Sequence, residues 1–340
     1  MTDHIILVYV YLLKDHPEQK ELIASLDEFS NEFPHKINLI NIENDKFLLD
    51  SYGDKVPVVD IGPYRLFSPI KEEEIRFAFL ETSRKIQVAT ERESNLVIDR
   101  FTKPPQITRS NRFSFWFSKH YMFLFNLAVL LYVGFAFMAP VLLKIGAIDA
   151  AKTIYTLYKP LCHQLAFRSF FIFGDQVVYP RESAHVDDLL TYGEVSGLDE
   201  NDIILARDFN GNERLGFKVA LCQRDIAIYL SIFIFGMIFS ISGRKIKPIP
   251  WYIWLILGIG PIGLDGFSQL LSQTGYAIFN WLPYRESTPI LRVITGGLFG
   301  LFTAWYGYPF VEESVEESRL QLLNKFAIVH QLIQKQGNKD

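Results

Sequence analysis

Cysteine is the scarcest chemically reactive residue in this chain, with two copies in 340 residues. They stand at Cys162 and Cys222, so the first 161 residues contain no thiol. Because the thiolate is the nucleophile of thiol–disulfide exchange, the N-terminal part of the chain cannot perform that reaction. Any thiol chemistry, and any binding of a metal through sulfur, is therefore confined to these two positions.

The chain also lacks a strong charge of one sign. Its 34 Lys and Arg residues nearly balance 38 Asp and Glu residues, and a net charge of −4 gives no indication of nucleic-acid binding. The first apolar run, residues 5–13, has neither a basic flank nor a cleavage site, so we expect no signal peptide. Hydrophobic residues make up 49% of the chain and charged residues 21%, which predicts a membrane protein with a soluble part.

Residues 1–90 alternate β-rich runs with helical patterns and predict a small α/β domain. We expect strands at 5–11, 37–42 and 56–62, and helices at 17–29, 45–52 and 71–84. This order resembles the thioredoxin fold, in particular its glutaredoxin-like branch, and the resemblance implies a cis peptide bond before Pro57. The Cys-x-x-Cys motif of that fold would lie around Leu13 to His16, where this chain has no cysteine. The resemblance therefore implies a redox-inactive docking or structural module, with a retained non-redox ligand site as the alternative.

Four apolar runs have the length of about 20 residues that a bilayer core requires. They predict membrane spans at residues 121–143, 219–241, 251–271 and 290–310 within a membrane domain 119–310. A basic and aromatic linker, 91–118, precedes the first span, and a basic run at 244–247 lies between spans two and three. The positive-inside rule places both on the cytoplasmic side. We therefore expect a multi-pass protein of the cell inner (cytoplasmic) membrane, with cytoplasmic termini and an amphipathic cytoplasmic tail at 311–340.

Residues 150–173 are apolar and aromatic but are interrupted by Lys159, Pro160, His163 and Arg168. A fifth span here would place the basic run 244–247 outside, so we predict a re-entrant or interfacial segment at the outer face. Residues 174–216 follow as a polar external loop of mixed charge. The predicted fold class is thus an α/β thioredoxin-like domain joined to an all-α polytopic membrane domain with four spans and this one extra segment.

Several polar residues are predicted to lie at one depth, near the outer ends of the spans. Ionisable residues inside spans cost about 2.5–3.5 kcal/mol each on insertion scales, so they normally pair and mark functional sites. Their clustering, from four separate pieces of chain, favours a site over scattered structural ion pairs. The predicted polar site consists of Arg168, Arg224, Asp265, Gln269, Glu286 and Arg292.

The two cysteines predict a second feature at the same depth. Cys222 and Asp225 are three residues apart and share a helix face, and thiolate, imidazole and carboxylate are ligands that zinc accepts. The candidate ligands of a zinc ion are Cys162, His163, Cys222 and Asp225. The alternative is a Cys162–Cys222 disulfide, which an outer, oxidising location permits, with His163 bonded to a backbone carbonyl. Both interpretations stay open at the level of the sequence.

Four motifs occur in order along the membrane domain. They are Cys162-His163-Gln164 with Arg168-Ser169-Phe170-Phe171, then Cys222-x-Arg224, then Asp265-Gly266-x-x-Gln269, then Leu291-Arg292-x-x-Thr295-Gly296-Gly297-x-x-Gly300. Over roughly residues 120–310 this pattern resembles a bacterial membrane-protein family, domain-of-unknown-function family 2085. The resemblance implies a compact multi-span domain without an established activity. Members of that family carry a second cysteine after Cys-x-Arg, where this chain has Asp225, and this favours a mixed-ligand metal site.

Three classes of function remain. The first is a membrane enzyme or binding protein with a metal or polar site at the outer leaflet, where Arg168, Arg224 and Arg292 would suit the phosphate of a lipid headgroup. The second is a thiol-redox membrane protein that uses Cys162 and Cys222 as a dithiol. The third is a structural or assembly subunit that docks into a membrane-protein complex through its thioredoxin-like domain. The sequence defines neither a reaction nor catalytic residues, and the expected partners are the bilayer, a lipid headgroup or such a complex.

Overall fold

The computed structural model describes residues 4–14, 16–43, 45–274, 281 and 283–337. The chain divides into two compact units, Met1–Ser118 with Glu316–Asp340, and Lys119–Val315. Two long helices, α5 (Arg109–Lys144) and α12 (Pro289–Gly337), contribute residues to both units.

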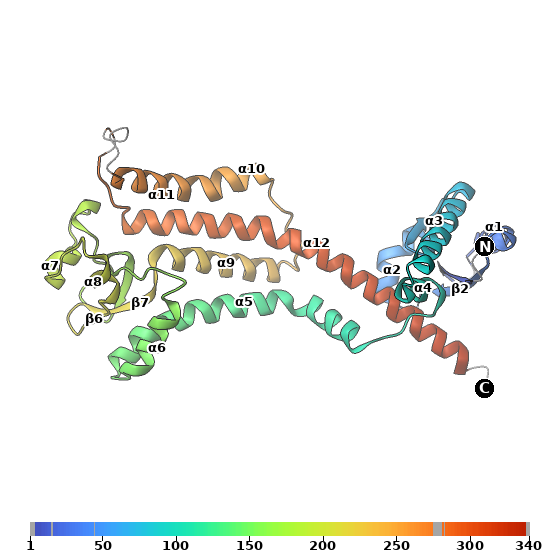
Figure 1. Ribbon diagram of the computed structural model, residues 1–340, viewed down its shortest axis with the longest axis horizontal. Coiled ribbons are helices and arrows are strands. Elements are labelled where there is room, and N and C mark those ends of the chain that lie inside the picture. Colours follow the sequence, from blue (N-terminus) through green and yellow to red (C-terminus); the bar gives the residue numbers. More distant parts are fainter. Residues whose placement is uncertain (1–3, 15, 44, 275–280, 282, 338–340) are drawn as a thin grey trace. The chain divides into compact units, whose positions relative to one another are not determined.

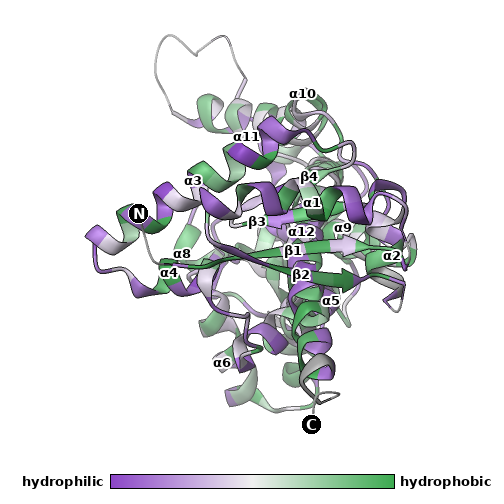
Figure 2. Ribbon diagram, turned by 90° about the vertical axis from the view of Figure 1, so that its right-hand side faces the viewer, coloured by the Kyte–Doolittle hydropathy of each residue, from purple (hydrophilic) through white to green (hydrophobic). Residues whose placement is uncertain are grey.

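The first unit is built on a mixed four-stranded sheet in the order β2-β1-β3-β4. The strands are β1 (Ile6–Leu12), β2 (His35–Asn41), β3 (Val58–Ile61) and β4 (Tyr64–Phe67). β1 pairs parallel with β2 and antiparallel with β3, and β3 pairs antiparallel with β4. The central strand β1 is mostly hydrophobic along its length because elements cover both of its faces (Figure 2).

The sequence predicted three of these strands. The structure adds the fourth, β4, which the sequence analysis did not predict. Gly62 and Pro63 form a two-residue turn that folds Tyr64–Phe67 back onto β3. Gly62 has a φ of +58°, and a Cβ at this position would lie 2.3 Å from Oγ1 of Thr82. Only glycine fits this turn, so the hairpin follows from a residue whose role the strand pattern alone does not reveal. The peptide bonds Val56–Pro57 and Ser68–Pro69 are cis.

Four helices of the first unit lie outside α5 and α12. They are α1 (Gln19–Glu28), α2 (Lys46–Tyr52), α3 (Glu72–Glu91) and α4 (Asn95–Thr102). Leu26 of α1 and Phe79 of α3 pack into one core cluster with the buried side chains of β1. Within the predicted linker 91–118, the chain forms α4 and the first turns of α5, separated by residues 103–108, which contain the two prolines.

The end of α12 is part of the folded first unit rather than a separate tail. Ala327 and Ile328 are buried in a second core cluster with Tyr52. Asn324 donates a hydrogen bond from Nδ2 to the hydroxyl of Tyr52 at 2.8 Å, and Gln331 both donates to and accepts from the backbone of Asn41. The apolar residues Leu320, Ala327, Ile328 and Leu332 of this helix therefore pack in the core cluster of the first unit.

The second unit contains a bundle of long apolar helices (Figure 1). These are α5, α9 (Gln223–Ile241), the run from α10 (Trp251–Ile253) through a π-helical turn to α11 (Gly260–Gln273), and α12. In the described part of the chain, four helices have the length and composition of membrane spans: Arg109–Lys144, Gln223–Ile241, Trp251–Gln273 and Pro289–Gln334. At most 28% of the residues in their apolar windows are buried, so the outward faces suit contact with lipid. The expectation of four helices that are long and apolar enough to span a membrane is confirmed.

The predicted start of the second span, Val219, needs correction. Residues 219–222 complete β7 (Gly216–Cys222), and α9 begins at Gln223. Val219, Ala220 and Leu221 are fully buried inside the unit, which explains an apolar run that continues upstream of the helix. Length and hydropathy cannot separate a buried strand from the first turn of a span.

Residues 145–222 form one folded region, which we call the cap. The sequence predicted two parts for most of it, a re-entrant or interfacial segment, 150–173, and a polar loop, 174–216. The elements of the cap are α6 (Ile148–Tyr158), β5 (Ser169–Ile172), α7 (Tyr192–Ser196), α8 (Ile203–Asp208), β6 (Gly211–Asn212) and β7. α6 has 11 residues, about half the length needed to cross a bilayer, and β5 pairs antiparallel with β7. Phe167, Phe171, Tyr179 and Tyr192 form the centre of a buried cluster, so the aromatic residues of this region make a core of their own.

Glycines bring α9 and α12 into close contact in the membrane part of the second unit. A Cβ at Gly296 would lie 2.7 Å from the carbonyl oxygen of Arg224, and one at Gly300 would lie 2.2 Å from the carbonyl oxygen of Ile228. Real Cβ atoms do not approach backbone oxygens this closely, so the two helices need glycine at both positions. The Thr-Gly-Gly-x-x-Gly motif therefore serves the packing of these helices.

The first prediction compares two glycines of the bundle. Gly300→Ala should destabilise the protein by roughly 1–3 kcal/mol, because the added methyl group forces α9 and α12 apart. The matched control is Gly263→Ala on α11, where a Cβ would meet no atom of the described residues within 4 Å and the change should be neutral or stabilising by up to about 1 kcal/mol. Thermal unfolding of the purified full chain measures both, and equal melting temperatures for the two variants would contradict this packing.

Candidate functional site

The junction between the cap and the bundle places both cysteines at the start of α9. Cys222 is the last residue of β7 and the residue before α9, and β5 holds it through the pairing of Ser169 with Cys222. Cys162 follows the end of α6 and accepts a hydrogen bond at Sγ from the backbone N–H of Cys222, at 3.3 Å. This hydrogen bond brings together two segments that lie sixty residues apart in sequence.

Cys162, Cys222 and Asp225 form a compact ligand set. One sulfur from each cysteine and one carboxylate oxygen of Asp225 all lie within 4.8 Å of one another. Both cysteines are free thiols. The fourth predicted ligand, His163, is not part of this group. It is exposed, whereas the neighbouring Cys162 is buried. The described residues whose ligand atoms converge at this point are therefore Cys162, Cys222 and Asp225.

The two thiols differ in acidity. The hydrogen bond with Cys222, together with burial and the nearby charge of Asp225, raises the pKa of Cys162 well above its ordinary value. The same hydrogen bond lowers the pKa of Cys222, and it outweighs the opposing effects of burial and of Asp225. The arrangement thus favours one thiolate, at Cys222, hydrogen-bonded by one thiol, at Cys162.

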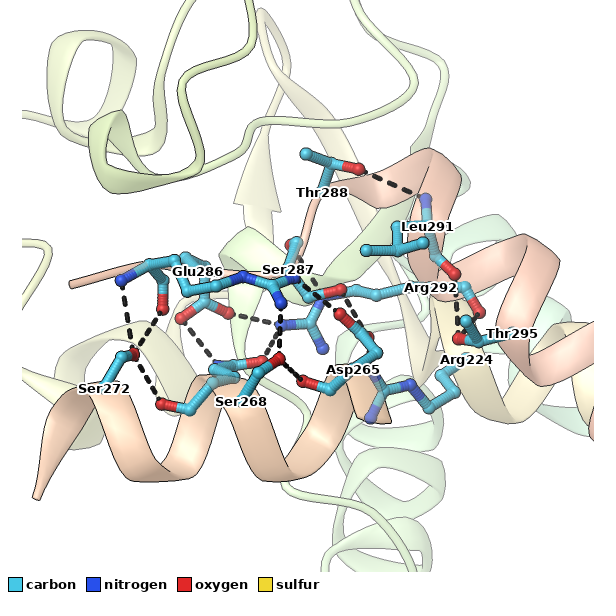
Figure 3. Close-up of polar contacts among 12 residues, drawn as sticks. Arg224, Asp265, Ser268, Ser272, Glu286, Ser287, Thr288, Leu291, Arg292 and Thr295 are labelled. Carbon is cyan, nitrogen blue, oxygen red and sulfur yellow. Dashed lines mark hydrogen bonds and ion pairs between the residues drawn. The ribbon is translucent and has the colours of Figure 1, made fainter. Parts of the chain in front are cut away.

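A second cluster lies on α11 and the segment that leads into α12 (Figure 3). Asp265 and Gln269 stand four residues apart on one buried face of α11. Asp265 Oδ1 accepts a hydrogen bond from Nη2 of Arg285 at 2.8 Å, and Oδ2 accepts from Ser287 at 2.7 Å and from Nη2 of Arg224. The carboxylate is 5% exposed, and these three donors replace the water that burial removes.

Glu286 is the second buried carboxylate of this cluster and joins the bundle to the cap. Arg168, in the cap, binds both of its oxygens through Nε at 2.8 Å and Nη2 at 3.0 Å. Arg292, in the first turn of α12, and Gln269 also donate to it, and Nη1 of Arg181 lies 3.7 Å from Oε2. Burial alone raises the pKa of Glu286, but the hydrogen bonds of Arg168 and the charges of Arg168, Arg292 and Arg181 outweigh it and hold the pKa below its ordinary value.

The structure brings together all six residues of the predicted polar site. Arg224 binds Asp265, Arg168 and Arg292 bind Glu286, and Arg292 Nη2 also donates to Gln269 at 3.3 Å. Sequence reasoning missed Arg181 and Arg285. Arg285 stands next to Glu286 in sequence, which was an available signal, whereas Arg181 lies in the region that looked like a solvated loop.

A buried lysine lies in the cap, on the strand that ends at Cys222 and outside the cluster of Asp265 and Glu286. Lys218 on β7 is fully buried, and its ammonium group donates to the carbonyl oxygens of Gln164 at 2.8 Å and Arg207 at 2.7 Å. Burial lowers the pKa of Lys218 to about 7, against the opposing charge of Asp208. A cavity of about 240 Å³ adjoins it, lined by Lys152, Tyr155, Thr156, Lys159, Gln164, Arg207, Asp208 and Asn210.

Comparisons with known proteins agree with the membrane character of this region. The model of a family described as "Predicted membrane protein (DUF2085)" matches residues 214–306. An uncharacterised protein of Methanocaldococcus jannaschii, MJ1492, is 25% identical over 206 residues, which cover 58% of this chain and 96% of that protein. No solved structure matches the chain. The chain is therefore a predicted membrane protein similar to a family of unknown function, and the resemblance to family 2085 is confirmed for residues 214–306.

The second prediction concerns the stability of the cap as a function of pH. The pKa of Lys218 lies near 7 in the folded chain and near 10.4 in an unfolded one, so between these values the unfolded state binds more protons. The free energy of opening β7 should therefore rise with pH across this window, by up to about 1.4 kcal/mol per pH unit. Asp208, Lys159, Arg207 and Cys162 are the charged or titratable groups that face this lysine.

Hydrogen exchange of the β7 amides, corrected for the intrinsic exchange rate at each pH, measures this free energy. Lys218→Met should flatten its pH dependence, whereas Lys152→Met, at an exposed lysine of α6, should leave it intact. The same slope in the parent chain and in Lys218→Met would show that Lys218 is not the titrating group.

Proposed function

We propose that this chain is an integral membrane protein that holds a divalent metal ion, zinc in the first instance, at Cys162, Cys222 and Asp225. The observation that carries the proposal is the convergence of two sulfurs and one carboxylate oxygen within 4.8 Å. Zinc–sulfur bonds of about 2.3 Å and zinc–oxygen bonds of about 2.0–2.2 Å fit a set of ligand atoms with this spacing.

The charge around Asp225 supports this assignment. Asp225 interacts with Cys222 and makes no ion pair within the described residues, although its neighbour Arg224 binds Asp265. A carboxylate in the first turn of a membrane helix normally pairs with a cation. In the metal-bound form, two thiolates and one carboxylate would supply three negative charges, and a divalent cation would offset two of them in the place of an arginine.

The number of ligands bears on what the ion would do. Structural zinc sites are closed by four protein ligands, whereas sites with three protein ligands keep a fourth position for water or for a substrate group. His163 is exposed and stands outside this group, so the described residues supply three ligands, and this favours a binding or catalytic ion over a structural one. The reaction class stays open, and no catalytic residue is assigned.

The second candidate function is thiol redox chemistry at the same two cysteines. The contact between a Cys222 of lowered pKa and a Cys162 of raised pKa is the arrangement from which a reversible disulfide can form. In this alternative Asp225 has no ligand role.

The third candidate is a docking or assembly role for the first unit. We propose a thioredoxin-like fold for it, supported by the sheet order β2-β1-β3-β4, the parallel β1–β2 pair and the helices that connect the strands. The absence of cysteine from this unit supports a redox-inactive module, and a membrane-protein complex is the expected partner.

The third prediction tests the metal site. Elemental analysis of the purified full chain should find a divalent metal, and Asp225→Asn should lower the metal affinity at least about tenfold, because a neutral amide is a weak ligand. The control is Asp175→Asn, at an exposed carboxylate in the cap that is 3.8 Å from Arg214. Stoichiometric metal retained in Asp225→Asn would remove Asp225 from the site.

A count of free thiols on the same samples separates the metal from the dithiol function. Under the metal proposal both cysteines are reduced, and they become reactive once a chelator removes the ion. Under the dithiol alternative, mass spectrometry should find a Cys162–Cys222 disulfide that a reductant opens, unchanged in Asp225→Asn. Metal-free protein with that disulfide would replace the first candidate by the second.

The fourth prediction tests the proposed orientation in the cell inner membrane, with both termini on the cytoplasmic side. A membrane-impermeant thiol label should reach an introduced Asn201→Cys from outside the cell and Lys245→Cys only after the membrane is opened. This follows from the basic flanks at 91–118 and 244–247. Labelling of Lys245→Cys in intact cells would reverse the orientation of the bundle and place the metal site on the cytoplasmic side.

A further inference from the structure

We propose that the arginine cluster around Asp265 and Glu286 is a binding site for a phosphoryl group. Five arginines pair with these two carboxylates: Arg224 and Arg285 with Asp265, and Arg168, Arg181 and Arg292 with Glu286. The inference stands on these contacts and does not depend on the metal ion proposed for Cys162, Cys222 and Asp225.

The charges of the cluster do not balance. Five guanidinium groups against two carboxylates leave an excess of three positive charges, and guanidinium groups stay protonated in proteins. Nearby acids offset this excess only in part, because a Cys222 thiolate acts on Arg292 and would offset one of the three charges. Asp225 faces the cysteines, and the carboxylate of Glu200 accepts from the backbone N–H groups of Glu182 and Gly193. An arginine network that served only to hold the fold together would need no such excess.

The positive groups are largely withdrawn from water, which makes the imbalance costly. Arg292 is 3% exposed and Arg181 7% exposed. Nε of Arg224 is buried and has no hydrogen-bond partner among the described residues. Buried charge without compensation costs several kcal/mol, so a bound anion would stabilise this arrangement.

The more exposed members show where an anion would enter. The side chains of Arg168 and Arg285 are 27% and 31% exposed, and that of Arg224 is 19% exposed. Arg285 and Arg224 hold Asp265 from two sides, and Arg168 reaches Glu286 from the cap. An anion that approaches from the surface would meet these three guanidinium groups before the two buried ones.

The size of the excess selects the chemical class of the ligand. A carboxylate brings one negative charge, whereas a phosphate monoester brings up to two and offers three terminal oxygens to planar, bidentate donors. Arginine is the residue that matches this geometry. Arg224 and Arg292 lie in the first turns of the candidate spans α9 and α12, the depth at which lipid phosphates gather. The phosphoryl group would belong either to a lipid headgroup or to a small soluble phosphate ester.

The fifth prediction uses the full chain in two arms that separate these sources. In the soluble arm, inorganic phosphate and glycerol 3-phosphate are titrated against chloride at equal ionic strength. In the lipid arm, native mass spectrometry compares retention of phosphatidic acid with that of diacylglycerol, which lacks the phosphate. Saturable binding in the soluble arm identifies a small phosphate ester, selective retention of phosphatidic acid identifies a headgroup, and either result supports the proposal.

Arg168→Gln should weaken the phosphoryl interaction at least about tenfold, because it removes a bidentate charged donor from the entrance. Arg168→Lys should weaken it less, since it keeps the charge. Arg214→Gln, at a mostly exposed arginine of the same cap, is the matched control and should bind as the parent does. Arg285→Gln serves as the second variant if Arg168→Gln fails to fold.

Two results would overturn the proposal: no saturable binding in either arm, or equal binding by Arg168→Gln, Arg285→Gln and the control. Metal content is measured on the same samples. If the protein contains metal but binds no phosphoryl ligand, the phosphoryl proposal fails. If it binds the phosphoryl ligand but contains no metal, the metal proposal fails.

Discussion

Two buried carboxylates organise the end of the bundle where the cap sits. Asp265 and Glu286 are 5% and 4% exposed, and an unpaired charge at that depth would cost several kcal/mol. The fold meets this cost by bringing donors from the cap, from α9, from α11 and from the start of α12 to two points. Loss of any one of these elements would leave a charge exposed to the apolar interior, so the ion pairs specify how cap and bundle fit together.

The separation of the two clusters follows from helix geometry at the start of α9. Successive residues of a helix point about 100° apart, so Arg224 and Asp225 face different neighbours although they are adjacent. Arg224 turns toward α11 and binds Asp265, and Asp225 turns toward Cys162 and Cys222. Gly296 allows α12 to approach the backbone of Arg224, so the same turn of α9 also packs closely against α12. The first turn of α9 thus contributes the Arg224 side chain to one cluster, the Asp225 side chain to the other, and a backbone surface that packs against α12.

Periodicity and hydropathy predicted the features that depend on the burial of whole segments. The four apolar helices and the three strands of the first unit follow from patterns of that kind, as does the level at which Arg168, Arg224, Asp265, Gln269, Glu286 and Arg292 meet. Features that depend on one residue or on one partner were not accessible. The strand β4 needs the turn at Gly62. The aromatic residues of 150–173 predicted a re-entrant or interfacial segment, whereas Phe167 and Phe171 pack in a core with Tyr179 and Tyr192.

The folding of the cap also explains why the sequence predicted six residues of the site but not Arg181. A polar residue inside an apolar helix stands out from its surroundings, so Asp265 and Arg292 carry a signal in the sequence alone. Arg181 lies among other polar residues, and its role comes from the folding of the cap, which buries it against the ring of Phe167 at 4.1 Å and aims it at Glu286. The six predicted residues carry a surplus of one positive charge, and Arg181 and Arg285 raise that surplus to three. The positive charge of the site is therefore larger than its predicted members show, and this charge is the property that a ligand would meet.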